Sequence, residues 1–402
     1  MTEKDKCMKI AFAGQPLLEE EKTGIGYYTE GLIQNIMRKN LSDKYYINIF
    51  SYKNPEESKE KIRKYEMENT NIEVCSRIPL TIYKLIWNIV PIPYHFLFKQ
   101  RADITHFFNY YIPPFVSGKR VCTIHDMTIK AYPETVRFKS RIMMRLNLRT
   151  TCKRATRIVT SSEFSKSEIV KYLKISPKKI SVLYSGVNLS LYKPCLDSSL
   201  ILEIKRKYGI IGDYFIYLGT LEPRKNIVRM IQAYSLLKSM NKDVPKLVIA
   251  GRKGWMYKDI FELIQNEKLE ANVILTGYIA QTDTPILLNG AKAFVFPSLY
   301  EGFGMPPLEA MACGTPVITS NCSSLPEVVG DAAILVDPYK IDEIAAAMNE
   351  LSTNDTLRNE LSQKGIKRAS LFSWDRISDS LHKIYEQVME EDNEKNKSST
   401  SK

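Results

Sequence analysis

The feature that most constrains the fold is the alternation of short apolar segments with longer helical segments in the second half of the chain. Six short apolar segments are predicted strands: Tyr214–Leu218, Lys246–Ala250, Asn272–Thr276, Ala293–Phe296, Pro316–Thr319 and Ala332–Val336. Strands connected through helices form a parallel sheet, because parallel neighbours need long crossovers. Right-handed crossovers then bring the loops that follow these strands to one edge of the sheet.

The first half of the chain shows the same alternation. Its predicted strands lie around Met8–Gly14, Ile104–Phe108, Arg120–Ile124, Ile158–Ser161 and Ile180–Gly186. With 402 residues, the chain is long enough for two domains of ordinary size. We predict an α/β protein with an N-terminal domain over residues 1–195, a C-terminal domain over 196–370, a helix over 371–390 and a disordered tail over 391–402.

One loop of the second domain combines helix-start and ligand-binding features. It follows the predicted strand Ala293–Phe296 and contains Gly302, Phe303 and Gly304 before a helix that we expect to begin at Pro306. Because Pro306 and its neighbour Pro307 have no N–H, the amides left to face an anion are those of Gly304, Met305 and Leu308.

Two carboxylates bracket this loop. Glu301 precedes it and can reach a polyol, whereas Glu309 lies about one turn into the helix, where it can bind a ribose. The two are separated by seven residues within Glu-Gly-Phe-Gly-(x)3-Leu-Glu-Ala-Met-Ala-Cys-Gly-Thr-Pro-Val. The bare spacing is common by chance, but the surrounding sequence resembles the E-x7-E signature of retaining glycosyltransferases of the GT-B fold, family 4.

The resemblance extends over nearly all of residues 8–390. It implies two Rossmann-like doubly wound domains that face each other across a cleft, with the activated-sugar donor on the C-terminal domain and the acceptor on the N-terminal domain. It also implies that the helix over 371–390 returns to the N-terminal domain.

Several donor-site residues follow from the same resemblance. Arg224 and Lys225, after the strand Tyr214–Leu218, are implied diphosphate ligands, although a basic pair in such a loop is often simply solvated. Ile279 matches the segment whose backbone contacts the base, and Phe303 belongs to the donor loop.

The N-terminal domain supplies weaker signals. Gly24 and Gly26 precede a predicted helix that begins at Tyr28, but Thr29 stands where the dinucleotide fingerprint needs its third glycine. On their own they fit a plain loop equally well, whereas the resemblance implies that they approach the donor phosphates. His125 ends the strand Arg120–Ile124. A histidine is more often a core or surface residue, but the resemblance implies that this one contacts the transferred sugar.

Cysteine usage and the first predicted strand bear on the compartment. The chain has seven cysteines and no C-x-x-C pair, which favours reduced thiols over a disulfide framework. No signal peptide precedes the first strand, so we expect a cytoplasmic protein. Leu80–Phe98 is nearly uncharged, but Pro91, Pro93 and Lys84 interrupt it, so a buried helix with a connector or a surface-docking element fits better than a membrane span.

Basic residues concentrate in the first half of the chain. Residues 1–200 contain 33 Lys and Arg against 19 Asp and Glu, whereas residues 201–402 contain 24 against 26. A nucleic-acid binder would explain this charge but not the acidic site loops, so we expect no nucleic acid partner.

A stripe of basic residues recurs every fourth position at Arg141, Arg145, Arg149 and Lys153, with Phe138, Ile142 and Leu146 beside it. One interpretation is a solvated helix whose apolar edge packs into the domain. The other is a helix that rests on the anionic inner face of the plasma membrane.

The chemistry implied by the resemblance is glycosyl transfer with retention. No D-x-D motif or cluster of metal-ligating residues is present in the sequence, so we expect a metal-independent hexosyltransferase without a cofactor. Arg224 and Lys225 would meet the charge of the leaving diphosphate, and Glu301 and His125 would orient the sugar.

The substrates are less determined than the reaction. Overall likeness to bacterial mannosyltransferases favours GDP-mannose, but UDP-glucose, UDP-N-acetylglucosamine and dTDP-rhamnose remain open. The expected acceptor is a glycan or lipid-linked glycan of surface polysaccharide biosynthesis. A sugar-nucleotide epimerase of the same architecture and a catalytically silent partner subunit are the alternatives, and the sequence does not indicate an oligomeric state.

Overall fold

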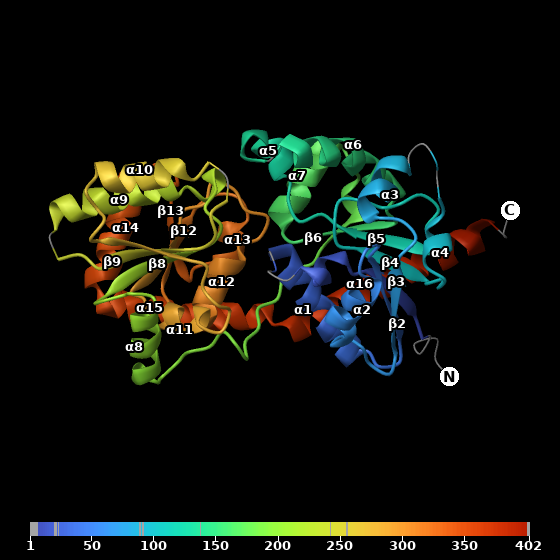
Figure 1. Cartoon of the computed structure of the whole chain (residues 1–402), viewed down its shortest axis with the longest axis horizontal. Helices are drawn as coiled ribbons and strands as arrows, with labels where there is room; N and C mark the ends of the chain where they lie inside the picture. The colour runs from blue at the N-terminus through green and yellow to red at the C-terminus, as the bar shows by residue number, and fades with distance from the viewer. Residues whose placement is uncertain are drawn as a thin grey trace. The chain divides into compact units, whose positions relative to one another are not determined.

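The computed structural model describes residues 7–19, 22, 24–87, 90, 92–136, 138–241, 243–254 and 256–399, without the side chains of residues 139, 140, 143, 146 and 392–399. It divides into two compact units (Figure 1). Unit 1 comprises Met1–Ile129, Arg137–Gly186 and Trp374–Lys402, and unit 2 comprises Lys130–Val136 and Val187–Ser373.

Unit 1 contains a seven-stranded parallel sheet in the order β3-β2-β1-β4-β5-β6-β7. Its strands are β1 Lys9–Ala13, β2 Lys44–Phe50, β3 Thr70–Cys75, β4 Ile104–Phe107, β5 Lys119–Thr123, β6 Arg157–Thr160 and β7 Ile180–Val182. Its helices are α1 Gly24–Lys39, α2 Pro55–Arg63, α3 Leu80–Ile86, α4 Tyr94–Leu97, α6 Phe138–Arg154, α7 Glu163–Leu173 and α16 Trp374–Ser399, and α5 Thr128–Ala131 ends in unit 2.

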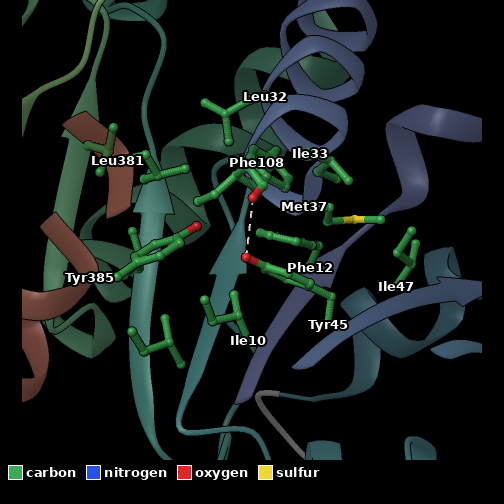
Figure 2. Close-up of a cluster of buried hydrophobic side chains, with 14 of the residues drawn as sticks. Ile10, Phe12, Leu32, Ile33, Met37, Tyr45, Ile47, Phe108, Leu381 and Tyr385 are labelled. Atoms are coloured by element: carbon green, nitrogen blue, oxygen red, sulfur yellow. Dashed lines mark hydrogen bonds between the residues drawn. The ribbon is translucent and has the colours of Figure 1, made fainter. Parts of the chain in front are cut away.

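The sheet of unit 1 is covered on both faces. Alternate residues of β1 point to opposite faces, so Ile10 and Phe12 enter one hydrophobic cluster while Ala13 enters the other. Figure 2 shows Leu381 and Tyr385 of α16 in the same cluster as Ile10 and Phe12. The last long helix of the chain therefore completes the core of the domain that the first strand begins.

Trp374, the first residue of α16, occupies space that two glycines leave open. A Cβ added at Gly31 would lie 2.3 Å from the Trp374 ring, and one added at Gly186 would lie 2.4 Å from it. The indole also contacts the ring of Tyr28, with 6.2 Å between centroids. This packing holds the start of α16 against α1.

Unit 2 contains a six-stranded parallel sheet in the order β10-β9-β8-β11-β12-β13. Its strands are β8 Tyr214–Leu218, β9 Lys246–Ala250, β10 Val273–Gly277, β11 Ala293–Phe296, β12 Val317–Ser320 and β13 Ala333–Val336. Its helices are α8 Ser198–Lys207, α9 Ile227–Met240, α10 Lys258–Asn266, α11 Thr284–Asn289, α12 Met305–Ala312, α13 Leu325–Val329, α14 Ile341–Thr353 and α15 Asp355–Ala369. The six strands predicted for this half are present, with small shifts at their ends.

Both sheets have the doubly wound topology. The strand order reverses between β1 and β4 in unit 1 and between β8 and β11 in unit 2. In open α/β sheets, ligands bind at the carboxyl ends of the strands beside such a reversal. The loops after β8 and β11 are therefore the first place to look for a site in unit 2.

Two predicted boundaries differ from the structure. The N-terminal domain was expected to end at residue 195, but the units divide after Gly186. The reason is that the following segment bonds within unit 2. The Val187 amide donates to the Phe372 carbonyl at 2.8 Å, and the Cys195 amide donates to Asn289 Oδ1 at 2.7 Å.

The second difference concerns the end of the chain. Disorder was expected from residue 391, but α16 continues to Ser399, and residues 400–402 lie outside the described residues. The Arg157 guanidinium forms an ion pair with Glu391. Within the described part of the chain, no helix combines the length and the apolar character needed to cross a bilayer.

The packing of Trp374 generates a prediction for stability. Gly31→Ala should lower the free energy of unfolding of unit 1 by about 1–3 kcal/mol, because the added methyl group overpacks the indole. Gly24→Ala is the matched control, since no atom lies within 4 Å of its added Cβ. Urea denaturation followed by tryptophan fluorescence measures both; equal stability of the two variants would contradict the packing described.

Candidate functional site

The loops after β8 and β11 of unit 2 meet at the carboxylate of Glu301. Its Oε2 lies 2.9 Å from Arg224 Nη1 and its Oε1 lies 2.7 Å from Lys225 Nζ. Ser298 Oγ donates a third bond to Oε1 at 2.6 Å. The residue is only 8% exposed. Burial favours the neutral acid, but the two cations and their hydrogen bonds outweigh it and lower the pKa of Glu301 to about 2.

The two cations are themselves held by further contacts. Arg224 Nη2 lies 2.7 Å from Glu222 Oε1, and Arg224 also donates to the Tyr300 carbonyl. The Lys225 ammonium lies 4.8 Å from the centroid of the Phe296 ring, and burial lowers its pKa although Glu301 opposes that effect. The predicted diphosphate ligands are thus fixed in position by two carboxylates, Glu222 and Glu301, rather than solvated.

The backbone ties the same two loops together. Asn226 has a φ of +61°, a conformation that Asn adopts more readily than most residues. Its Nδ2 donates to the carbonyls of Pro297 at 3.0 Å and Pro338 at 2.7 Å. The Leu299 amide donates to the Arg224 carbonyl at 2.9 Å. The positions of Arg224 and Lys225 are therefore set by main-chain contacts to the loop that carries Glu301.

The glycine loop turns the chain into α12. Gly304 has a φ of +120°, which residues with a side chain rarely adopt. An added Cβ would also lie 2.9 Å from Leu325 Cδ2, so both the backbone conformation and the available space disfavour a side chain. The helix begins at Met305, one residue before the predicted start. The Leu308 amide was one of the three amides predicted to face an anion. It donates instead to the Gly304 carbonyl at 3.4 Å, within the helix.

Phe303, which the sequence places in the donor loop, is held by its side chain. Its side chain is buried and its ring lies 5.7 Å from that of Phe372, in an edge-to-face arrangement. Ser324 Oγ lies 2.7 Å from the Phe303 carbonyl and 2.9 Å from the Glu301 carbonyl. The aromatic ring of Phe303 thus anchors the loop, and the backbone is what it can offer to a ligand.

Glu309 lies in a different environment from Glu301. Burial raises the pKa of Glu309 to about 8, against a hydrogen bond with Tyr192 that lowers it. Tyr192 belongs to the segment that precedes α8. Near pH 7 the structure therefore holds Glu301 as an anion and Glu309 as a neutral acid. This separation by environment is the usual way in which two carboxyl groups of one site take different tasks.

The loops after β9 and β10 carry a residue pair that the sequence analysis missed. Ile279 is buried, so only its backbone is available to a base. Its neighbour Tyr278 is 53% exposed, and the Arg252 guanidinium lies 4.6 Å from the centroid of its ring. An exposed aromatic ring at this edge can stack on a flat ligand. The available signal was two glycines, Gly251 directly after β9 and Gly277 at the end of β10, with φ values of +150° and +72°.

His125 lies in unit 1, just after β5. Its Nε2 is 3.1 Å from the Phe108 carbonyl, which can only accept, so Nε2 bears the proton and Nδ1 is the acceptor of the neutral ring. Burial lowers the pKa of His125, against the Phe108 carbonyl and Asp126. The ring of Tyr28 stands perpendicular to the imidazole, with 5.1 Å between centroids. His125 therefore presents a neutral, oriented imidazole.

Gly24 and Gly26 were expected to precede the helix, but they lie in the first turn of α1. An added Cβ at Gly24 meets nothing within 4 Å, whereas one at Gly26 would lie 3.1 Å from Lys22 Cβ. The first amides of a helix have no intrahelical acceptor, so the segment offers a helix N-terminus. Among the described residues, no group of three or more His, Cys, Asp or Glu could hold a metal ion.

Helix α6 buries a different face from the one expected if its apolar edge packed into the domain. Leu148, Thr151 and Cys152 are buried, whereas Phe138 is 65% and Ile142 43% exposed. Arg145 and Arg149 are exposed as well. The side chain of the third apolar residue of the predicted stripe, Leu146, lies outside the described set.

Comparisons with known proteins agree with this architecture. A family model described as Glycosyltransferase Family 4 matches residues 26–191, and one described as Glycosyl transferases group 1 matches residues 202–368. The chain is 32% identical over 379 residues to the O-antigen chain mannosyltransferase B of Escherichia coli, covering 92% of this chain and 97% of that protein. It is 30% identical to the O-antigen chain mannosyltransferase RfbU of Salmonella typhimurium over 54% of this chain and 56% of that protein.

Solved structures share the fold at low identity. A structure of Anabaena HepE with UDP and glucose has a TM-score of 0.73 at 19% identity, covering 94% of this chain and 99% of that one. WaaG, described as a glycosyltransferase involved in lipopolysaccharide biosynthesis, has a TM-score of 0.70 at 15% identity, covering 93% and 99%.

The environment of Glu309 generates a prediction for pH dependence. Its folded pKa lies above the ordinary carboxyl value, so between pH 5 and about 8 the folded state binds more protons than the unfolded state, and stability falls as pH rises. Glu309→Gln should flatten this fall. Glu301→Gln is the control, because a folded pKa of about 2 affects stability only as pH drops below the ordinary carboxyl range. Urea unfolding at pH 5, 6.5 and 8 measures the slopes; an unchanged slope in Glu309→Gln would contradict the assignment.

Proposed function

Because this chain belongs to family 4 of the glycosyltransferases and has the GT-B fold, we propose that it transfers a hexose from a nucleoside-diphosphate sugar to a glycan or lipid-linked glycan, with retention of anomeric configuration. The observation that carries this proposal is the Glu301, Arg224 and Lys225 cluster at the strand-order reversal of unit 2. It brings two cations and one ionised carboxylate to the place where such sheets bind nucleotides.

The leaving nucleoside diphosphate gains negative charge as the glycosidic bond breaks. Arg224 and Lys225 are already oriented by Glu222 and Glu301, so no reorganisation is needed when that charge develops. The amides of Gly304 and Met305 at the start of α12 add to them. We therefore assign the stabilisation of the leaving group to these residues, without a metal ion.

The sugar itself is assigned to Glu301 and His125. An ionised carboxylate accepts hydrogen bonds from sugar hydroxyls, and so does Nδ1 of a neutral imidazole. Glu309, as a neutral acid near pH 7, can both donate to and accept from the ribose hydroxyls of the donor. In the proposed reaction, the acceptor oxygen attacks the anomeric carbon on the face that the diphosphate leaves, and the departing phosphate oxygen takes the acceptor's proton.

The proposed donor is GDP-mannose and the proposed setting is surface polysaccharide biosynthesis. Support comes from the names of the two relatives, both O-antigen chain mannosyltransferases. The exposed Tyr278 with Arg252 above its ring is our candidate platform for the base.

The direct test is an assay with purified protein, short mannose-containing glycans and, in parallel, GDP-mannose, UDP-glucose, UDP-N-acetylglucosamine and dTDP-rhamnose. We expect transfer from GDP-mannose, a product whose anomeric configuration by NMR matches that of the donor, and the same rate in EDTA. An inverted product or a metal requirement would overturn the mechanism. Formation of an epimer without any acceptor would identify an epimerase instead.

We also propose that α6 binds the anionic face of a membrane. Phe138 and Ile142 are exposed on the helix that also exposes Arg145 and Arg149 and carries Arg141, so apolar and cationic side chains reach solvent together there. Each basic residue near such a surface contributes about 1 kcal/mol. The enzyme would then work as a peripheral protein at the inner face of the plasma membrane, beside a lipid-linked acceptor.

Sedimentation with liposomes tests this proposal. Changing Arg141, Arg145 and Arg149 to Gln should weaken binding to vesicles that contain anionic lipid by about a hundredfold, since three residues at about 1 kcal/mol are lost. A control variant with Lys166, Lys171 and Lys178 changed to Gln removes the same charge elsewhere in unit 1. Equal loss in both variants, or no binding by the parent, would show that α6 is only a solvated helix.

A further inference from the structure

Lys84 of α3 is a half-buried cation without a carboxylate. Its Nζ lies 3.7 Å from the centroid of the Tyr111 ring, and no ion pair of this residue is found among the described residues. Burial alone lowers the pKa of Lys84 to about 8. Lys171 offers a comparison, because it also lies over a tyrosine ring, at 4.9 Å from Tyr172, but pairs with Glu168 at 3.1 Å.

A second cation reaches the neighbouring residue. Arg154, the last residue of α6, donates from Nη1 to the Ile112 carbonyl at 2.9 Å. Burial lowers the pKa of Arg154, and within the described ranges it has no ion pair either. Lys84 and Arg154 thus converge on two consecutive residues, Tyr111 and Ile112. Holding two partly buried cations without an anion costs free energy, which a bound anion would recover.

The position of this pair favours a ligand over a purely structural role. Tyr111 lies in the loop after β4, at the carboxyl edge of the sheet and beside the strand-order reversal between β1 and β4. The same loop contains Phe108, whose carbonyl orients His125. The two cations and the proposed sugar-contacting histidine therefore all contact one short loop, the one after β4.

The aromatic residues around the pair show another unsatisfied donor. Trp87, with its ring 5.8 Å from that of Tyr111, has a buried indole N–H with no hydrogen-bond partner in the described part of the chain. An unpaired buried donor in a native structure calls for a partner that the protein does not supply. Two cations without an ion-pair partner among the described residues and one unpaired donor therefore lie around Tyr111 and Ile112.

We propose that Lys84 and Arg154 form an acceptor subsite that binds a phosphate group, so that the acceptor of this enzyme carries a phosphate near the sugar that is extended. The inference rests on the proposed glycosyl transfer and specifies its acceptor class. Lys supplies a compact charge and Arg a planar fork, the two side chains best suited to phosphate oxygens. A neutral oligosaccharide would leave both cations unpaired.

Phosphate binding can be measured without donor or turnover. The probe is inorganic pyrophosphate, titrated calorimetrically into a parent in which Arg224→Ala and Lys225→Ala remove the proposed donor-side anion ligands. Lys84→Gln should weaken binding about ten- to hundredfold, the effect of losing one hydrogen bond to a charged group. Lys84→Arg keeps the charge and should bind within a fewfold of the parent. Lys171→Gln is the matched control and should bind as the parent does.

Two further probes separate the sources of the phosphate. Tighter binding of dodecyl phosphate than of mannose 1-phosphate, lost in Lys84→Gln, would indicate a lipid-linked acceptor, and the reverse order would indicate a soluble sugar phosphate. Thermal unfolding of each variant shows whether it is folded. If Lys84→Gln does not fold, the binding measured for Lys84→Arg tests the proposal instead. If all three probes bind Lys84→Gln as tightly as the parent, the inference is overturned, while the proposed glycosyl transfer is unaffected. Binding that depends on Lys84 in a protein without transferase activity would refute the proposed function alone.

Discussion

The site depends on one electrostatic constraint, the buried carboxylate of Glu301. An ionised carboxyl group with little solvent around it is tolerated only when it is paired and hydrogen-bonded, and here Arg224, Lys225 and Ser298 supply those contacts. These partners come from the loops after β8 and β11, so satisfying one charge fixes both loops at the strand-order reversal. The same contacts orient the two cations before any ligand arrives, which is what the proposed stabilisation of a diphosphate requires.

The two carboxyl groups of the E-x7-E motif show how environment divides their tasks. Glu301 lies between two cations and stays ionised, whereas Glu309 is buried against Tyr192 and stays protonated near neutral pH. An anion suits the polarised hydroxyls of a sugar, and a neutral acid that also donates suits a ribose. The spacing in the sequence brings both side chains to one helix start, but their charge states follow from tertiary contacts that the motif does not contain.

Much of the fold could be predicted from the sequence because the strands of unit 2 are short apolar runs between helices. The family resemblance predicted Glu301, Arg224 and Lys225 as site residues, and the structure brings these three side chains into contact. Glu222, Ser298 and Asn226 could not be identified in this way, since their roles depend on how two distant loops meet. Gly24 and Gly26 were expected in a loop because glycine disfavours helices, yet the first helical turn tolerates it. The domain boundary was placed too late because a hydrogen bond from the Cys195 amide to the Asn289 side chain, which no sequence pattern indicates, ties that segment to unit 2.

The central claim is that Arg224 and Lys225 stabilise the leaving diphosphate, and turnover at saturating donor measures it most directly. Arg224→Ala and Lys225→Ala should each slow turnover about a hundredfold, since a removed donor to a developing charge costs roughly 3 kcal/mol. Each substitution is also made in a Glu301→Gln background, which avoids leaving a buried carboxylate unpaired. The free energy of unfolding of each variant is measured to show that it is folded. Turnover close to the wild-type rate in both folded variants would contradict the account.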